Sequence, residues 1–207
     1  MTSADADEDL VVAEKIAPDK PGMLSVLAIA GIVSAIFKLG SLAMTLPWML
    51  APHLFQRDPD PNAPLELVEY QRQMVEVQAK YVTFQVGLAP LSILVAAALF
   101  WAALKAYQLS KRGDVWMRRV CAASAIVDAI GGVMFFLVQR DNFFALQAAF
   151  QNADTDNSTL SVMMIAMKAA FYFGMAIGGG YLLLHFAYYY FAFRYFSKSE
   201  VRALYQV

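Results

Sequence analysis

Three charged residues stand alone inside long uncharged stretches of this sequence. Lys38, Asp128 and Lys168 are each the only charged residue in a stretch of twenty or more. A charge at hydrocarbon depth is costly, so each marks either an ion pair between helices or a site for an ion, a proton or a lipid headgroup. Asp128 shares a four-residue spacing with Ser124 and Gly132, which places it on a small-residue helix face that should point into a bundle. A lysine stem reaches far enough for either lysine to pair with Asp128.

Pro90 adds a second kind of polar group to this intramembrane site. A proline inside a helix leaves the carbonyl of the residue four positions earlier, here Val86, without its hydrogen bond. Such a carbonyl lines a water or ion site in some membrane proteins, and in others the proline only shapes the bundle. The candidate polar site therefore consists of Lys38, Asp128, Lys168 and Pro90.

Four apolar stretches must position these residues. They cover roughly residues 23–46, 81–107, 115–139 and 160–194. Each is long enough to cross about 30 Å of hydrocarbon as an α-helix, which takes about 20 residues. Because 59% of the residues are apolar and only 16% are charged, a soluble globular domain is excluded. We predict an all-α integral membrane protein whose transmembrane domain, residues 21–198, is a four-helix bundle.

The second and fourth helices are predicted to extend beyond the bilayer. Helical periodicity continues over residues 65–111, with Gly113 as the stop, and over residues 159–196. The first helix is predicted to end at Pro47, because proline cannot continue the hydrogen-bond ladder. Residues 141–151, after the third helix, are interpreted as a further helical turn or an interfacial segment.

Two surfaces are spaced for packing against another helix. The projecting part of the second helix carries apolar residues three and four apart, and we name this set the outer seam: Leu67, Tyr70, Met74 and Val77. The fourth helix carries a ridge of small residues: Ala170, Gly174 and Gly178. Either surface could pack within the chain or against a second copy or a partner protein.

The distribution of Lys and Arg predicts the orientation. Ten of these residues fall in segments on the side of the two termini and only four on the other side, so both termini are predicted to be cytoplasmic, in an inner or plasma membrane. Residues 1–20 are predicted to be a disordered acidic tail and residues 199–207 a second cytoplasmic tail. With this orientation, residues 47–80 are predicted to form a segment, and residues 140–159 a loop, on the outer side of the membrane. The aromatic run 188–196 is interpreted as an interfacial anchor.

The sequence lacks the motifs of common catalytic and metal sites. His53 and His185 are predicted at opposite membrane faces, and the single Cys121 is interpreted as a packing residue. We expect no enzyme activity, cofactor, metal or nucleic-acid partner. The first functional hypothesis is a structural or accessory membrane subunit that acts through helix packing, in contact with membrane lipids and with a second copy or a membrane-protein partner. The alternative is a small channel, transporter or lipid-binding subunit that uses the buried Asp and Lys site.

Overall fold

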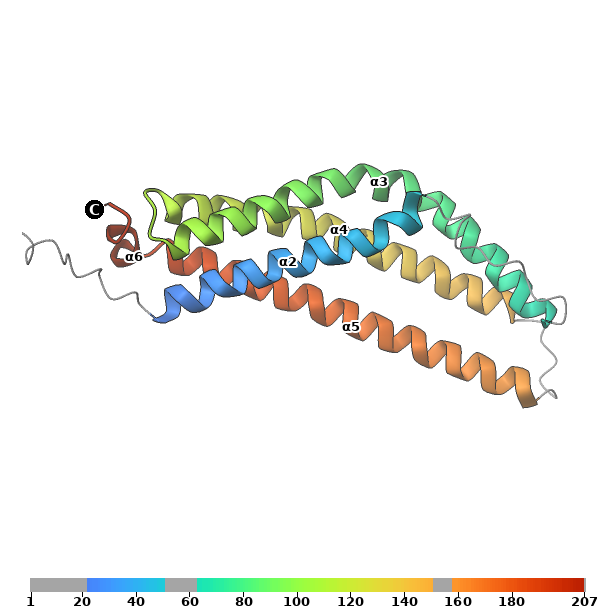
Figure 1. Cartoon of the computed structure of the whole chain (residues 1–207). Helices are drawn as coiled ribbons and strands as arrows, with labels where there is room; N and C mark the ends of the chain where they lie inside the picture. The colour runs from blue at the N-terminus through green and yellow to red at the C-terminus, as the bar shows by residue number, and fades with distance from the viewer. Residues whose placement is uncertain (1–21, 51–62, 151–157, 207) are drawn as a thin grey trace, which may run out of the picture.

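The computed structural model describes residues 22–50, 63–150 and 158–206, and within these ranges the regular structure is entirely helical. The helices are α2 (Gly22–Leu50), α3 (Leu65–Tyr107), α4 (Gly113–Ala149), α5 (Ser158–Phe196) and the short α6 (Ser199–Ala203). α3 packs against α2 and α4, and α4 packs against α5 (Figure 1). The prediction of an all-α four-helix bundle is confirmed. The predicted acidic tail and most of the proline-rich linker lie outside the described residues.

Three of the four long helices are about twice as long as the hydrocarbon core of a bilayer is thick. α3 has 43 residues, α4 has 37 and α5 has 39. At about 1.5 Å per residue each is roughly 55 to 65 Å long, about twice the hydrocarbon thickness. The interpretation of residues 141–151 as further helix is confirmed for residues 141–149, which contain no Gly or Pro and continue α4 without a break, so the connection expected from residue 140 starts only after Ala149. We call the end of the bundle that carries α6 the α6 end, and the opposite end the distal end.

Two expected helix boundaries are also wrong. α2 continues through Pro47 to Leu50, because a proline in the last turn removes only one hydrogen bond of the helix. Gly113 is the first residue of α4 rather than a stop for α3, which ends at Tyr107. A Cβ on Gly113 would lie 2.9 Å from the carbonyl oxygen of Lys105, so glycine is needed there for the close approach of α3 and α4.

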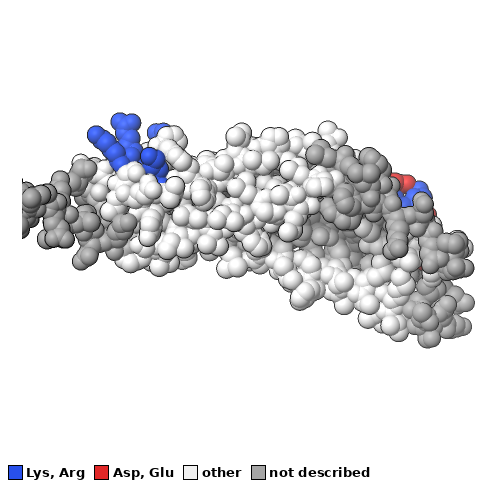
Figure 2. Space-filling view, in the orientation of Figure 1, with Lys and Arg blue, Asp and Glu red and all other residues white. Residues whose placement is uncertain are grey.

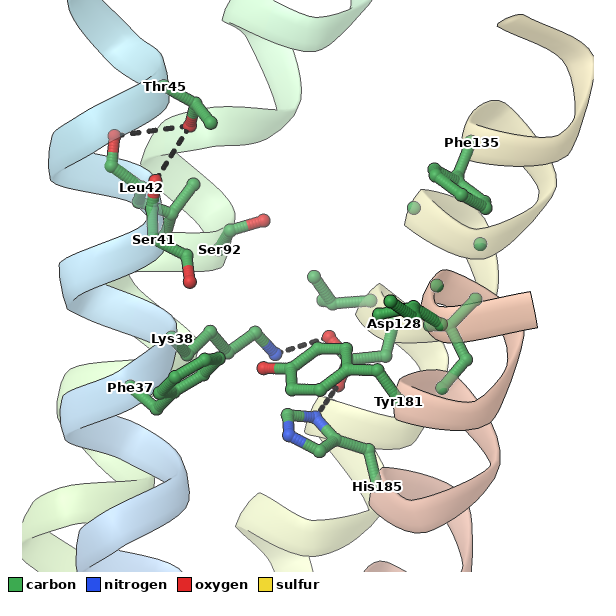
Figure 3. Close-up of a pocket in the computed structure, with 16 residues that line it drawn as sticks. Phe37, Lys38, Ser41, Leu42, Thr45, Ser92, Asp128, Phe135, Tyr181 and His185 are labelled. Carbon is green, nitrogen blue, oxygen red and sulfur yellow. Dashed lines mark hydrogen bonds and ion pairs between the residues drawn. The ribbon is translucent and has the colours of Figure 1, made fainter. Parts of the chain in front are cut away.

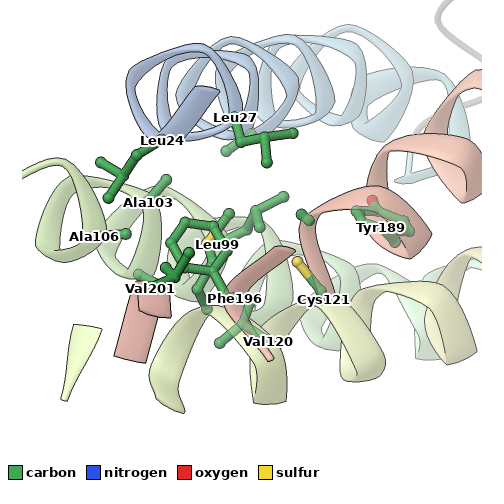
Figure 4. Packing of buried hydrophobic residues seen from close by; sticks show 14 of the residues in the cluster. Leu24, Leu27, Leu99, Ala103, Ala106, Val120, Cys121, Tyr189, Phe196 and Val201 are labelled. Carbon is green, nitrogen blue, oxygen red and sulfur yellow. The ribbon is translucent and has the colours of Figure 1, made fainter. Parts of the chain in front are cut away.

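The main hydrophobic core lies toward the α6 end. Small residues on α3, Ala102, Ala103 and Ala106, are fully buried and let the neighbouring helices approach closely. Larger side chains from α3 itself and from the other helices fill the space around them (Figure 4): Leu24, Leu27, Leu99, Met117, Cys121, Tyr189, Phe196 and Val201.

The C-terminal segment is part of this core rather than a separate tail. Val201 of α6 is buried, and so is Tyr205 just after it. The Tyr205 hydroxyl donates a hydrogen bond of 3.0 Å to the carbonyl of Ala106 on α3. The few apolar residues of so short a segment give no clear periodicity, so the sequence alone predicts a tail at residues 199–207.

One residue of the outer seam, Tyr70, packs within the chain. Tyr70 contacts a small apolar cluster at the distal end, whose other members are Met164, Met167, Leu146, Ala149 and Phe150. Leu67, Met74 and Val77 are half-buried on the same helix. The in-chain interpretation of the seam therefore holds for Tyr70.

Polar contacts also fix α3 to α4 at the distal end. Lys80 Nζ and the Tyr81 hydroxyl donate hydrogen bonds of 2.7 and 2.8 Å to the same carboxylate oxygen of Asp141. Arg140 contacts the other oxygen at 2.8 Å. The hydrogen bonds from Lys80, Tyr81 and Arg140 hold the pKa of the Asp141 carboxyl well below its usual range.

Charge is concentrated at the two ends of the molecule. Figure 2 shows Lys and Arg gathered at the α6 end, an uncharged middle on the face in view, and a smaller charged group at the distal end. Large apolar side chains such as Val33, Leu94 and Leu183 are exposed along the middle. Within the described residues, four helices are long and apolar enough to cross a membrane.

Candidate functional site

Asp128 on α4 is the centre of a buried polar cluster (Figure 3). Lys38 on α2 forms an ion pair with one carboxylate oxygen. The other oxygen accepts a hydrogen bond of 2.7 Å from the Tyr189 hydroxyl and lies 3.2 Å from His185 Nδ1, both residues being on α5. The side chains of Lys38 and Asp128 are only 12% and 8% exposed. One carboxylate thus joins three helices.

The hydrogen-bond geometry of His185 defines its orientation. Because Nδ1 faces the carboxylate, we assign its proton to that nitrogen, which leaves Nε2 to accept from the Ser34 hydroxyl at 3.4 Å. The network therefore runs from Ser34 on α2, through His185 and Asp128, back to Lys38 on α2. Lys38 and Asp128 carry opposite charges, and this neutralisation makes their joint burial tolerable.

Helix periodicity explains how the cluster forms. Tyr181, His185 and Tyr189 are spaced by four residues and therefore lie along one face of α5. The rings of Tyr181 and His185 are in contact, with centroids 4.1 Å apart. On α4, Gly132 lies one turn from Asp128 and lets Leu182 of α5 pack closely, because a Cβ there would lie only 3.1 Å from the Leu182 side chain.

A cavity of about 480 Å³ lies beside the cluster, between α2, α4 and α5. Lys38, Asp128, Tyr181 and His185 form its polar side, and Ser41, Thr45 and Ser92 add hydroxyls (Figure 3). The remaining wall is mostly apolar and is formed by Phe37, Leu42, Val127, Gly131, Gly132, Phe135, Ile177, Gly178 and Leu182. Cavities of this size, apolar with a few convergent polar groups, are typical of small-molecule sites.

The cavity offers more hydrogen-bond donors than acceptors. Both Asp128 oxygens already have partners, whereas Lys38 has three N–H groups and uses one of them on Asp128. In the described part of the chain, the Tyr181 hydroxyl forms no hydrogen bond. The arrangement is therefore suited to binding an acceptor oxygen attached to an apolar body.

The structure brings together Lys38 and Asp128 but not the other two members of the predicted site. Lys168 is half-buried on α5, seventeen residues before His185 and so about 25 Å away along the helix. The sequence predicts that the third apolar helix ends near residue 140, but α4 continues for nine more residues, which shifts Asp128 by about 14 Å relative to the end of the helix. Pro90 is exposed and does not line the cavity.

The small-residue ridge of α5 is divided between two environments. Gly178 lies against the ring of Phe135 on α4, where a Cβ would overlap the ring. Gly174 and Ala170 are exposed, and a Cβ on Gly174 would meet nothing within 4 Å. Close packing of the whole ridge within the chain, one of the two expected uses, is therefore wrong: α5 stays in contact with α4 toward the distal end through Phe143 and Phe171, but Ala170 and Gly174 are exposed.

His185 and Tyr189 are the site residues that the sequence analysis missed. His185 was predicted near one membrane face, and Tyr189 was assigned to an aromatic anchor, but both are buried. Their four-residue spacing with Tyr181 on the fourth apolar helix was the available signal, and it pointed to a shared helix face.

Comparison with family models, curated proteins and solved structures finds no significant match. Among the described residues, no group of three or more His, Cys, Asp or Glu side chains is arranged to hold a metal ion. The fold and site define a four-helix bundle with a buried ion pair beside a largely apolar cavity. Its function is therefore inferred from the chain's own residues.

Proposed function

We propose that this chain is a non-enzymatic, multi-pass membrane protein that binds a membrane-soluble amphiphile in the cavity beside Asp128. Four helices of sufficient length and the uncharged middle of the molecule support a membrane location (Figure 2). Because Lys and Arg gather at the α6 end, we place that end and both termini on the cytoplasmic side of an inner or plasma membrane.

The observation that carries the proposal is the position of polar groups in a mostly apolar cavity. Lys38 and Asp128 each lie about 20 to 25 Å along their helices from the α6 end, well inside the apolar segments. α2 and α5 diverge from this level toward the distal end (Figure 1). A ligand dissolved in the bilayer would enter between these two helices, without crossing the polar surface.

The charge of the cluster favours an uncharged ligand headgroup. The ion pair of Lys38 and Asp128 has no net charge, so an anionic headgroup would be desolvated near the Asp128 carboxylate without a cation of its own. A carbonyl or ester oxygen needs only the free donors of Lys38 and Tyr181. The cavity would hold the head and the start of an apolar tail, and the rest of the tail would lie in lipid.

Photolabelling in nanodiscs tests this proposal. The probe is the methyl ester of a diazirine-bearing palmitic acid, compared with the free acid and with a diazirine alkane that lacks the ester. We expect the ester to label peptides that contain the cavity walls of α2, α4 and α5. Labelling by the alkane at an equal level would contradict the role of the donors, and stronger labelling by the free acid would contradict an uncharged headgroup.

Two matched substitutions sharpen the test. Leu182 lines the cavity, whereas the neighbouring Leu183 is 71% exposed. We expect Leu182→Trp to fill the cavity and reduce ester labelling about tenfold, and Leu183→Trp to leave it unchanged. Tyr181→Phe removes a free donor without breaking a hydrogen bond of the protein and should weaken labelling by the ester but not by the alkane. Equal effects of the two tryptophan variants would overturn the cavity as the binding site.

A specific observation favours a structural or accessory role as the second candidate. The apolar stretch of α5 that qualifies it as a membrane span has no buried residue, and it exposes Ala170 and Gly174. A second copy or a membrane-protein partner could approach this surface closely. Native mass spectrometry from mild detergent should then show an oligomer or a co-purified protein that Gly174→Leu removes. A monomer for both wild type and variant would exclude this role.

A further inference from the structure

A second cavity lies toward the α6 end, about 15 Å along α4 from Asp128. Its volume is about 320 Å³, and it shares no lining residue with the first cavity. Val115, Arg118, Arg119 and Ala122 of α4 form one side, and Phe193 of α5 forms the other. We call this the arginine groove.

The two arginines of the groove are incompletely neutralised. Arg118 Nη2 lies 3.4 Å from Asp114, whose carboxylate also lies 3.9 Å from Arg202 Nε on α6. The Nε atom of Arg118 is buried without a hydrogen-bond partner. Arg119 is exposed and, within the described chain, has no ion-pair partner. A buried N–H group without a partner is unfavourable, so the groove would gain from an anion.

We propose that the arginine groove binds the phosphate of an anionic phospholipid. Guanidinium groups match phosphate oxygens in bidentate geometry, and two adjacent groups can hold one phosphodiester. Beside them, Val115, Ala122 and the 46%-exposed Phe193 provide an apolar surface for the start of an acyl chain. The groove lies where the basic start of α4 gives way to the uncharged stretch between Arg119 and Asp128, at the level of lipid headgroups. Free phosphate would leave the apolar surface unused.

Lipid binding by the full-length chain tests the proposal. Phosphatidylglycerol and phosphatidylcholine with identical acyl chains are titrated into detergent-solubilised protein, and bound lipid is counted by native mass spectrometry. We expect Arg118→Gln with Arg119→Gln to lower phosphatidylglycerol affinity about tenfold and to leave phosphatidylcholine binding unchanged. The matched control is Lys111→Gln with Arg112→Gln, which removes two exposed cations outside the groove at the same end. This control should change affinity less than about twofold.

Two results would contradict the proposal. Equal losses in the two double variants would show that the cations act only through diffuse charge. Displacement of phosphatidylglycerol by millimolar inorganic phosphate would identify free phosphate as the ligand. If Arg118→Gln impairs folding, Arg119→Gln alone and the pair Arg118→Lys with Arg119→Lys keep the test decisive. We expect the first to weaken binding, and the second to bind between wild type and the glutamine pair because lysine keeps the charge without the bidentate geometry.

Discussion

His185 Nδ1 on α5 lies 3.2 Å from the Asp128 carboxylate on α4, although 57 residues separate them in the chain. The same carboxylate pairs with Lys38 on α2, so it links α5 to α2 at the level from which these two helices diverge (Figure 1). Substitutions in this cluster should therefore affect both the stability of the bundle and the shape of the cavity.

Removal of one partner of the ion pair should destabilise the protein more than removal of both. Lys38→Met leaves the Asp128 charge buried without a counter-charge, and Asp128→Asn does the same to Lys38. We expect each single variant to lose about 3 kcal/mol of unfolding free energy, and the double variant, which keeps no unpaired buried charge, to lose only about 2 kcal/mol instead of the additive total of about 6 kcal/mol. Equilibrium unfolding in detergent measures the unfolding free energy of the wild type, the two single variants and the double variant. Additive losses would show that the two charges do not stabilise each other.

The hydroxyl of Tyr189 should contribute to stability through Asp128. Tyr189→Phe removes a buried hydrogen bond of 2.7 Å to a charged acceptor, which typically lowers the unfolding free energy by about 2 kcal/mol. Tyr190→Phe is the control, because that ring is exposed on the next residue and should change stability by less than about 0.5 kcal/mol. Thermal unfolding of the two variants compares them directly, and equal midpoints would contradict the importance of the bond.

The two halves of the α5 ridge should respond differently to an added methyl group. Gly178→Ala pushes against the Phe135 ring and should cost about 1 to 3 kcal/mol, whereas Gly174→Ala meets open space and should be neutral or slightly stabilising. Monomer stability in detergent measures the difference. A larger loss for Gly174→Ala would mean that this face of α5 is packed against something, as the accessory role requires.

The distal end should weaken in acid through Asp141. Its pKa in the folded protein is depressed, chiefly by the hydrogen bond from Lys80, so its contribution is present above the unfolded pKa and is lost as pH falls toward the folded value. Below about pH 4, the usual pKa of Asp, wild type should therefore lose more stability than Asp141→Asn. Unfolding between pH 6 and pH 3 measures the loss. Glu200→Gln, which removes an exposed carboxylate, should follow wild type, and parallel curves for wild type and Asp141→Asn would contradict the prediction.

The helical architecture could be predicted because it depends on local properties. Long apolar stretches without charge can satisfy their backbone in a membrane only as helices, and their number and approximate positions follow directly. The helix boundaries could be predicted less accurately than the number of helices. Pro47 and Gly113 are residues that often end helices, but here one lies inside a helix and the other begins one.

The candidate site could be predicted only in part. A lone acid and a lone base in apolar helices indicate a buried pair, and Lys38 and Asp128 are indeed paired. Which lysine pairs with Asp128 depends on the axial register of the helices, and an error of nine residues in the length of α4 made Lys168 an equal candidate.

The sequence by itself determined that this chain forms four long apolar helices and that Asp128 needs a buried partner, because hydrocarbon imposes both requirements on each segment separately. Only the tertiary structure decided that Lys38, His185 and Tyr189 are the partners and that a cavity lies beside them. The physical reason is that contacts between helices depend on their relative shift and divergence, which side-chain packing across the whole bundle sets and no single segment encodes.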